Sequence, residues 1–213
     1  MKNQKVQIVL ILFLACFFFQ NSNAASNFVT TDKSWELVKN EKDILIYYRW
    51  IEFENGGKTR EMKAEFTIDA EISKIVKQFS ASENYLKWAV GIKSCDIYQT
   101  SDTLWYTHTI MNYPWPYNKK DLVTRHYLKD INNGVVININ ADPDFIAVND
   151  KIERMKNYKG FWEISVLESN KSKIRYQVIS YEKPIVPRFI QDPIIQNQLI
   201  KSFVKLKKLA EEE

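Results

Sequence analysis

Alternating apolar and polar side chains are the clearest pattern in the middle of the chain. Within residues 59–68 the apolar positions are Met62, Ala64, Phe66 and Ile68. Side chains of a strand point alternately to its two faces, so this period of two predicts a strand with one buried face. Residues 44–53 are aromatic and β-branched, and Asn55-Gly56-Gly57 between the two segments tolerates the backbone angles of a tight turn. The two segments are therefore predicted to form an antiparallel hairpin.

The same pattern recurs downstream. Residues 121–128 and 135–141 flank the turn-forming Asn132-Asn133-Gly134, and residues 161–167 and 173–180 flank a second polar turn, Glu168-Ser169-Asn170. A further strand is predicted over residues 103–112. Together these segments predict an antiparallel meander of seven to nine strands.

Two short segments between the early strands have helical spacing instead. The first follows Asp69 as a capping residue, and its apolar face consists of Ile72, Ile75, Val76 and Phe79. The second follows Ser82 as a cap, and its apolar residues are Tyr85, Leu86 and Trp88. Two short helices are therefore predicted between the second and third strands.

A longer amphipathic helix is predicted at the C-terminal end, after Asp192 as a cap and Pro193 at the first helical position. Its apolar face consists of Ile195, Leu199, Phe203, Leu206 and Ala210, and its opposite face carries Lys201, Lys205 and Lys208. Because this helix follows all the strands, its apolar face must cover the concave side of the sheet. The predicted class is an α+β helix-grip fold, in which a curved antiparallel sheet wraps around a long C-terminal helix.

The N-terminal segment has the composition of a secretory leader. Residues 1–5 carry two lysines and no acid, residues 6–19 are almost entirely apolar, and residues 22–25 offer small side chains to a peptidase. The apolar run is shorter than the roughly 20 residues that span a bilayer, which favours cleavage over a retained anchor. We expect a signal peptide over residues 1–24 and export, to a bacterial periplasm. The alternative is lipoprotein anchoring at Cys16, where the surrounding residues match the required motif only loosely.

Composition narrows the range of functions. The chain has 213 residues, of which 45% are hydrophobic and 26% charged, as is typical of a globular protein. Five glycines and two histidines leave little for a phosphate-binding loop or a histidine-rich metal site, so no cofactor and no metal are expected. The net charge of +4 includes two leader lysines, and the small remainder does not predict nucleic-acid binding. Residues 25–213 contain no linker or repeat and are predicted to form a single domain, with Cys95 as a small buried residue.

Three segments match a known pattern of motifs. They are Tyr113-Pro114-Trp115-Pro116-Tyr117-Asn118-Lys119-Lys120-Asp121-Leu122-Val123, Tyr158-Lys159-Gly160-Phe161-Trp162-Glu163-Ile164 and Pro184-Ile185-Val186-Pro187-Arg188-Phe189. With this order of elements they resemble the START domain, the lipid-transfer module related to the steroidogenic acute regulatory protein, within the Bet v 1-like superfamily. The resemblance covers residues 34–209. The chain departs from it at Lys120, where the family usually has arginine, and at Tyr181-Glu182-Lys183-Pro184, where an Asp-Pro or Asp-x-x-Gly is usual.

The resemblance implies a tunnel between the sheet and the last helix that encloses one apolar molecule. Loops around Trp115 and Pro187 would act as a lid, Phe189 and Ile190 would face the opposite lip, and Trp88 would belong to the core or the tunnel wall. The sequence permits such a gap, because one helix over a curved sheet leaves a space for bulky side chains or a ligand. Pattern alone leaves both a filled core and an occupied tunnel open.

Both histidines lie on predicted strands. From Asp121 onward, Leu122, Thr124, His126 and Leu128 share the face that lacks cations, so His126 is predicted to point inward. The resemblance implies a ligand contact there, and the alternative is a half-buried histidine bonded to a backbone carbonyl. His108 alternates with neighbours of mixed polarity, so its face is undetermined. Pairing of the two strands would bring the histidines near one another, although two imidazoles alone do not make a zinc site.

The sequence therefore predicts a monomeric, exported protein that binds or shuttles a lipid or other hydrophobic small molecule and contacts membranes transiently. One alternative is a cyclase-like or hydrolytic enzyme in which His126 and Tyr106 act as base and acid, although no nucleophile motif is present. A ligand-sensing module is the other alternative. The candidate ligand contacts are His126, Thr124, Tyr106, His108, Trp88, Trp115, Phe189, Ile190 and Phe203.

Overall fold

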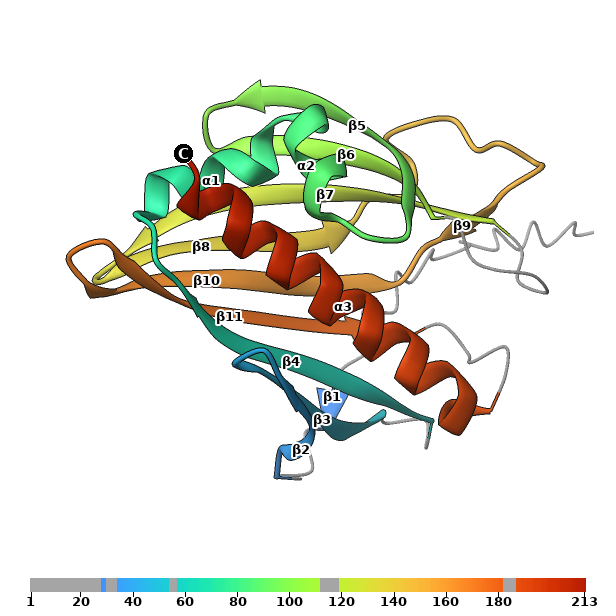
Figure 1. Ribbon diagram of the computed structural model, residues 1–213. Coiled ribbons are helices and arrows are strands. Elements are labelled where there is room, and N and C mark those ends of the chain that lie inside the picture. Colours follow the sequence, from blue (N-terminus) through green and yellow to red (C-terminus); the bar gives the residue numbers. More distant parts are fainter. Residues whose placement is uncertain (1–27, 30–33, 54–56, 112–118, 182–186) are drawn as a thin grey trace, which may run out of the picture.

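A long C-terminal helix crosses the concave side of one curved sheet, with two short helices beside it (Figure 1). The structure is a computed structural model, and it describes residues 28–29, 34–53, 57–111, 119–181 and 187–213. In chain order the elements are β1 (Phe28–Val29), β2 (Glu36–Glu41), β3 (Ile44–Phe53), β4 (Lys58–Ile68), α1 (Ile72–Ser80), α2 (Ser82–Trp88), β5 (Ile92–Ser101), β6 (Leu104–Met111), β7 (Lys120–Ile131), β8 (Gly134–Ala141), β9 (Glu153–Met155), β10 (Tyr158–Glu168), β11 (Lys171–Ser180) and α3 (Arg188–Glu211). The predicted α+β helix-grip fold is confirmed. The predicted signal peptide and Trp115 lie outside the described residues.

The strands form a single sheet with the order β1-β3-β4-β11-β10-β8-β7-β6-β5, in which β2 also pairs with β3 and β9 with β7. All of these pairs are antiparallel except β7 with β9. The sequence predicted seven to nine strands, and the two shortest of the eleven, β1 and β9, account for the excess. The three hairpins expected from turn residues are present as β3–β4, β7–β8 and β10–β11.

The sheet is more than a meander, because its two halves join through strands far apart in the sequence. After β4 the chain crosses through α1 and α2 to β5 at the opposite edge, and then returns strand by strand to β11. There β11 pairs with β4, in a register that runs from Ser172 opposite Ile68 to Ile179 opposite Glu61. The last strand therefore closes the sheet against one of the first.

The core forms where the inward face of the sheet meets α3. The alternation predicted for β4 is confirmed, since Met62, Ala64, Phe66 and Ile68 are all buried. On α3 the predicted apolar face points to the sheet, and the Phe203 ring stacks on Phe66 with centroids 4.9 Å apart. Cys95 on β5 is buried as expected, and burial raises the pKa of its thiol to about 12. Within the described ranges no helix is long and apolar enough to cross a membrane.

The predicted helix caps are wrong at all three starts. The N-cap of α1 is Glu71 and not Asp69, because the chain is still turning out of β4 at residues 69–70. Ser82 is the first residue of α2, and its hydroxyl accepts a hydrogen bond from the Ile97 N–H at 3.1 Å. The long helix begins at Arg188, so Pro193 lies inside it. Tertiary contacts therefore displaced these helix starts from the positions that local capping favours.

A buried ion pair holds a cover on the outer face of β7. Arg154 on β9 donates from Nη2 to Asp121 Oδ2 at 2.7 Å, and from Nη1 to the carbonyls of Pro143 and Ile146 at 2.7 and 2.8 Å. Burial alone would raise the pKa of Asp121, but hydrogen bonds from Arg154 and His108 hold it below its ordinary value. The segment between β8 and β9 is thereby tied to the sheet.

The turn between β7 and β8 depends on a glycine. Gly134 has φ +151°, and a Cβ placed there would lie 2.0 Å from the Ile164 carbonyl oxygen of β10. Gly134→Ala is therefore expected to lower the free energy of unfolding by about 2–4 kcal/mol, because the backbone of β10 must move. Urea unfolding measures this loss. Asn132→Ala, in the exposed part of the same turn, should cost less than about 0.5 kcal/mol, and equal losses in the two variants would contradict the steric explanation.

Candidate functional site

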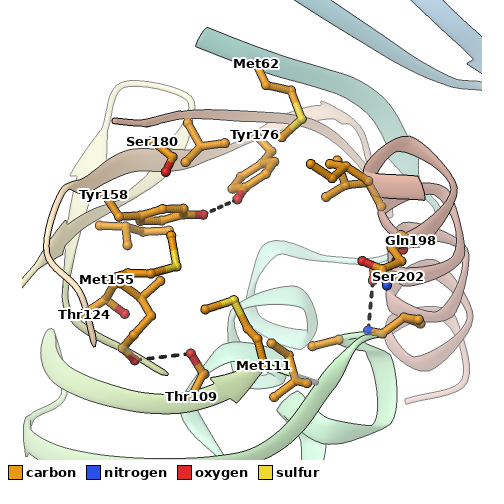
Figure 2. A pocket seen from close by; sticks show the side chains of 18 of the residues that line it. Met62, Thr109, Met111, Thr124, Met155, Tyr158, Tyr176, Ser180, Gln198 and Ser202 are labelled. Atoms are coloured by element: carbon orange, nitrogen blue, oxygen red, sulfur yellow. Dashed lines mark hydrogen bonds between the residues drawn. The ribbon is translucent and has the colours of Figure 1, made fainter. Parts of the chain in front are cut away.

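A cavity of about 410 Å³ lies between the sheet and the N-terminal half of α3. Strands β3 to β11 of the sheet contribute residues to its walls, together with α2 and α3 (Figure 2). This volume falls within the range of roughly 300–1,000 Å³ that is usual for small-molecule sites. The fold therefore leaves room for one ligand.

The wall is mostly apolar, and one end of the interior is filled. The apolar wall residues are Met62, Trp88, Ala89, Val90, Ile92, Met111, Leu122, Ile139, Met155, Trp162, Val178, Ile194, Ile195, Leu199 and Phe203. Around Phe203 the rings of Trp162 and Tyr176 pack edge to face, with centroids 5.7 and 5.8 Å away. Beyond this cluster, Leu206 and Ala210 of α3 are fully buried. Both of the alternatives left open by the sequence are thus realised, since the interior is solid beside the C-terminal half of α3 and hollow beside its N-terminal half.

Several uncharged hydrogen-bonding groups line the hollow half. The hydroxyls of Tyr158 and Tyr176 bond one another at 2.6 Å (Figure 2). On the helix side, Ser202 accepts from the Val90 N–H at 3.0 Å and donates to the Gln198 carbonyl at 2.9 Å. These polar groups are partnered within the protein, so they can orient a ligand without charging the cavity.

His126 belongs to a second uncharged group on β6 and β7. Its Nε2 lies 2.8 Å from Thr124 Oγ1 and 3.1 Å from Thr107 Oγ1, and its ring stacks on Trp105 at 5.3 Å between centroids. Burial lowers the pKa of His126 to about 3, so the imidazole is neutral at pH 7. Among the described residues its Nδ1 has no hydrogen-bond partner. The expected bond to a backbone carbonyl is replaced by bonds to threonine hydroxyls.

Comparisons with solved structures identify the fold of the chain. The STAR-related lipid transfer protein fragment from Xanthomonas axonopodis matches 83% of this chain and 98% of its own, with a TM-score of 0.73 at 20% identity. Human STARD10 matches 83% of this chain and 72% of its own, with a TM-score of 0.66 at 13% identity. The chain has the START-domain fold.

The START fold also accommodates an enzyme among the matched structures. The Zhui aromatase/cyclase from Streptomyces sp. R1128 matches 71% of this chain and 93% of its own, with a TM-score of 0.53 at 11% identity. At the level of sequence, no model of a known protein family and no curated protein matches the chain. The likeness is therefore one of fold.

Within this START fold, four of the candidate contacts line the cavity: Trp88, Thr124, His126 and Phe203. Phe189 and Ile190 do not line it, but they are exposed on the first turn of α3, next to Arg188 and Gln191, which do. Phe189 is 78% exposed. Trp115 lies outside the described residues.

Tyr106 and His108 lie outside the cavity, which corrects their assignment as ligand contacts. On β6 the inward residues are Trp105, Thr107 and Thr109, so Tyr106 and His108 project from the outer face. Tyr106 stacks on Phe145 with centroids 3.7 Å apart, and His108 Nε2 lies 2.9 Å from Asp121 Oδ2. The two histidines therefore lie on opposite faces of the sheet. The sequence could not assign these faces, because the cover held by Arg154 lets the outer face carry aromatic residues as well.

Several other residues of the cavity were not identified from the sequence, although the alternation of apolar and polar positions indicated some of them. Tyr158 and Tyr176 occupy the even positions of β10 and β11, the same face as the buried Trp162 and Ile174, so extending the alternation would have found them. Arg60 also lies on the inward face of β4, where a cation is normally predicted to face solvent. Gln198 and Ser202 on α3 could be assigned to the cavity only after the structure shows which face of this helix is turned toward the sheet.

The chemical groups around the cavity are poorly arranged for acid–base catalysis. Asp192 provides the one carboxylate among the described lining residues, and its Oδ1 lies 2.5 Å from Arg60 Nη2. His126 and Tyr106 cannot act as a pair, since the sheet separates them. Nowhere in the described residues do three metal-ligating side chains of His, Cys, Asp or Glu gather.

Burial of the neutral His126 imidazole is expected to make the protein less stable in acid. The pKa of His126 falls from about 6.5 in the unfolded chain to about 3 in the fold, so the unfolded chain binds more protons between these values. Stability is fully present above pH 6.5 and decreases as the pH falls toward 3. Relative to His126→Gln, the wild type should lose about 1.4 kcal/mol per pH unit between pH 6 and 5, measured by urea unfolding. Parallel pH profiles for the two proteins would contradict burial of a neutral histidine.

Proposed function

We propose that this protein binds one lipid or similar apolar molecule in the cavity and carries it between membranes. The observation that supports this most directly is the cavity itself, which is of ligand size, has a mostly apolar wall and carries uncharged polar groups in its interior. Removing apolar ligand surface from water contributes about 25 cal/mol per Å². Contact with the apolar wall would therefore supply most of the affinity, and the hydroxyl groups and His126 would select among ligands.

The comparisons support the same proposal. The Xanthomonas protein is named as a STAR-related lipid transfer protein, and a human structure named as StAR-related lipid transfer protein 5 matches with a TM-score of 0.63 at 14% identity. These names describe the matched proteins. For this chain they favour lipid binding, because the cavity has a suitable lining in the same fold.

A binding role is favoured over catalysis. A cyclase-like reaction needs an acid and a base that face each other across the ligand. Here the imidazole of His126 is flanked by threonine hydroxyls, and the lining carboxylate is already paired with Arg60. We therefore propose that the protein is not an enzyme.

Exposed apolar residues beside the cavity favour transport of a ligand over sensing of one. Phe189 and Ile190 are exposed on the turn of α3 that borders the cavity, and apolar residues in such a place can enter the surface of a bilayer. We propose that this turn contacts the membrane transiently during ligand exchange. With its predicted leader removed, the protein would act as a monomer in a bacterial periplasm.

A tryptophan placed in the cavity tests the proposal. Leu199→Trp adds bulk to a residue that lines the cavity, so it is expected to reduce ligand occupancy at least about tenfold, because the space is already partly filled by Phe203. Occupancy is measured by native mass spectrometry of the mature chain as purified and after loading with fluorescent lipids. The wild type is expected to show one bound lipid per chain.

The matched control is Val204→Trp, since Val204 is exposed on the opposite face of the same helix. This variant should retain the adduct. If the wild type binds no apolar molecule, or if the two tryptophan variants retain ligand equally, carriage in this cavity is refuted.

Membrane contact is tested by Phe189→Ser. The change removes an exposed apolar group that does not line the cavity, so transfer of a fluorescent lipid to vesicles should slow about threefold or more while ligand affinity stays unchanged. Val148→Ser, which alters another exposed apolar residue in the cover between β8 and β9, serves as control. Equal transfer rates in both variants would exclude the first turn of α3 as the contact.

A further inference from the structure

We call the end of the cavity that is lined by Arg60, Arg188 and Asp192 its mouth. This end carries more positive than negative charge. Arg60 on β4 and Arg188 at the start of α3 both line it, together with Asp192. Asp192 pairs with Arg60 at 2.5 Å. Arg188 stacks over the Trp50 ring at 5.3 Å and forms no ion pair with a carboxylate of the described residues. One guanidinium charge at the mouth therefore has no counterion within the described part of the chain.

This excess charge is held in a partly desolvated place. The side chains of Arg60 and Asp192 are only 15% and 16% exposed. Burial lowers the pKa of Arg188, and the neighbouring charge of Arg60 lowers it further, whereas Asp192 acts in the opposite direction. A second guanidinium beside a carboxylate that is already paired is stabilised by a further anion, because a partly buried charge without a partner is costly. The N-terminal end of α3 adds positive potential at the same point.

The rest of the cavity has the opposite character. The hydroxyl pairs and the neutral His126 face the interior without a net charge. Lys120 also lines the cavity, but its Nζ lies 2.8 Å from Glu153 Oε1. A ligand charge is therefore accommodated at the mouth and disfavoured inside.

We propose that the preferred ligand is a single-chain amphiphile with an anionic head group, a carboxylate or a phosphate ester, bound by Arg188 and Arg60 at the mouth. Its apolar chain extends inward toward His126. Guanidinium groups bind carboxylate and phosphate oxygens through paired hydrogen bonds, which suits both heads. A cavity of about 410 Å³, near the low end of the usual range, favours one chain over two. The inference rests on the proposed function, because a chain must occupy the cavity for its head to meet the arginines.

The experiment compares ligands that share a chain and differ in the head. Palmitoleic acid, palmitoleyl alcohol and methyl palmitoleate compete with a neutral fluorescent lipid for the mature protein at pH 8, below the concentration at which the acid forms micelles. The acid is expected to bind about fivefold more tightly than the alcohol, the ratio that a partly exposed ion pair of about 1 kcal/mol supplies. Dodecyl phosphate should show a similar advantage over dodecanol.

Two variants change this preference in opposite directions. Arg188→Gln should remove the advantage of the acid over the alcohol, because the acid loses its charged partner and the alcohol does not, whereas Asp192→Asn should increase the advantage by freeing Arg60. Arg125→Gln makes the same substitution at an exposed position of β7 and should preserve the preference. Equal loss in Arg188→Gln and Arg125→Gln would overturn the inference, since only net charge would then matter.

The remaining outcomes separate the two proposals. If acid and alcohol bind equally well, the anionic head is refuted and carriage of an apolar molecule stands. If no ligand binds, both proposals fail. If millimolar acetate or inorganic phosphate abolishes the advantage of the acid, the arginines form a site for free anions. If Arg188→Gln weakens only binding to phosphatidylglycerol vesicles, they serve the membrane surface. Either of the last two results would overturn the inference.

Discussion

The structure depends on a mismatch between one helix and a wide, curved sheet. The eleven strands of the described residues offer more concave surface than the apolar face of α3 can cover, so the space must be filled or left hollow. Aromatic rings fill it beside the C-terminal half of the helix, where Phe203 contacts Phe66 and Trp162. Toward Arg188 the lining residues of α3 are mixed, with Gln191 and Asp192 beside Ile194 and Ile195, and a hollow remains between the helix and the sheet. The cavity is the part of the core that the sequence leaves unfilled.

Charged and uncharged polar groups occupy different parts of the cavity. Uncharged hydroxyl pairs and the neutral His126 line the interior, as in the threonine pair beside His126, and Lys120 there is paired with Glu153, whereas Arg60, Asp192 and Arg188 gather where α3 begins. The dense packing around β7 stabilises this arrangement from outside, because Arg154 fills the outer face with hydrogen bonds to Asp121 and three backbone carbonyls. Residues 120–124 of β7 are buried on both faces, which holds Thr124 and the adjacent His126 in a fixed register.

The sequence predicted the fold well and the site only in part. Period-two alternation in β4 and β7 and the helical face of α3 depend on local residue order, so the hairpins, the long helix and the inward position of His126 could be deduced. Pairing of β4 with β11 and the starts of the helices depend on distant contacts, and a single sequence does not display these. Tyr106 and His108 were misassigned because a cover over the outer face removed the polarity difference between the two sides. Arg60 and Arg188 were missed because cations are normally expected in solvent.

The pairing of β4 with β11 has a consequence for how the molecule acquires its shape. Partners such as Phe66 and Ile174 are separated by more than one hundred residues, so the contact order is high and formation of the closed sheet is slow. An N-terminal fragment lacks β11 and α3, and therefore exposes the apolar face of β4. Until β11 and α3 have been synthesised, this apolar face lacks its partners, and exposed apolar strands of this kind promote aggregation.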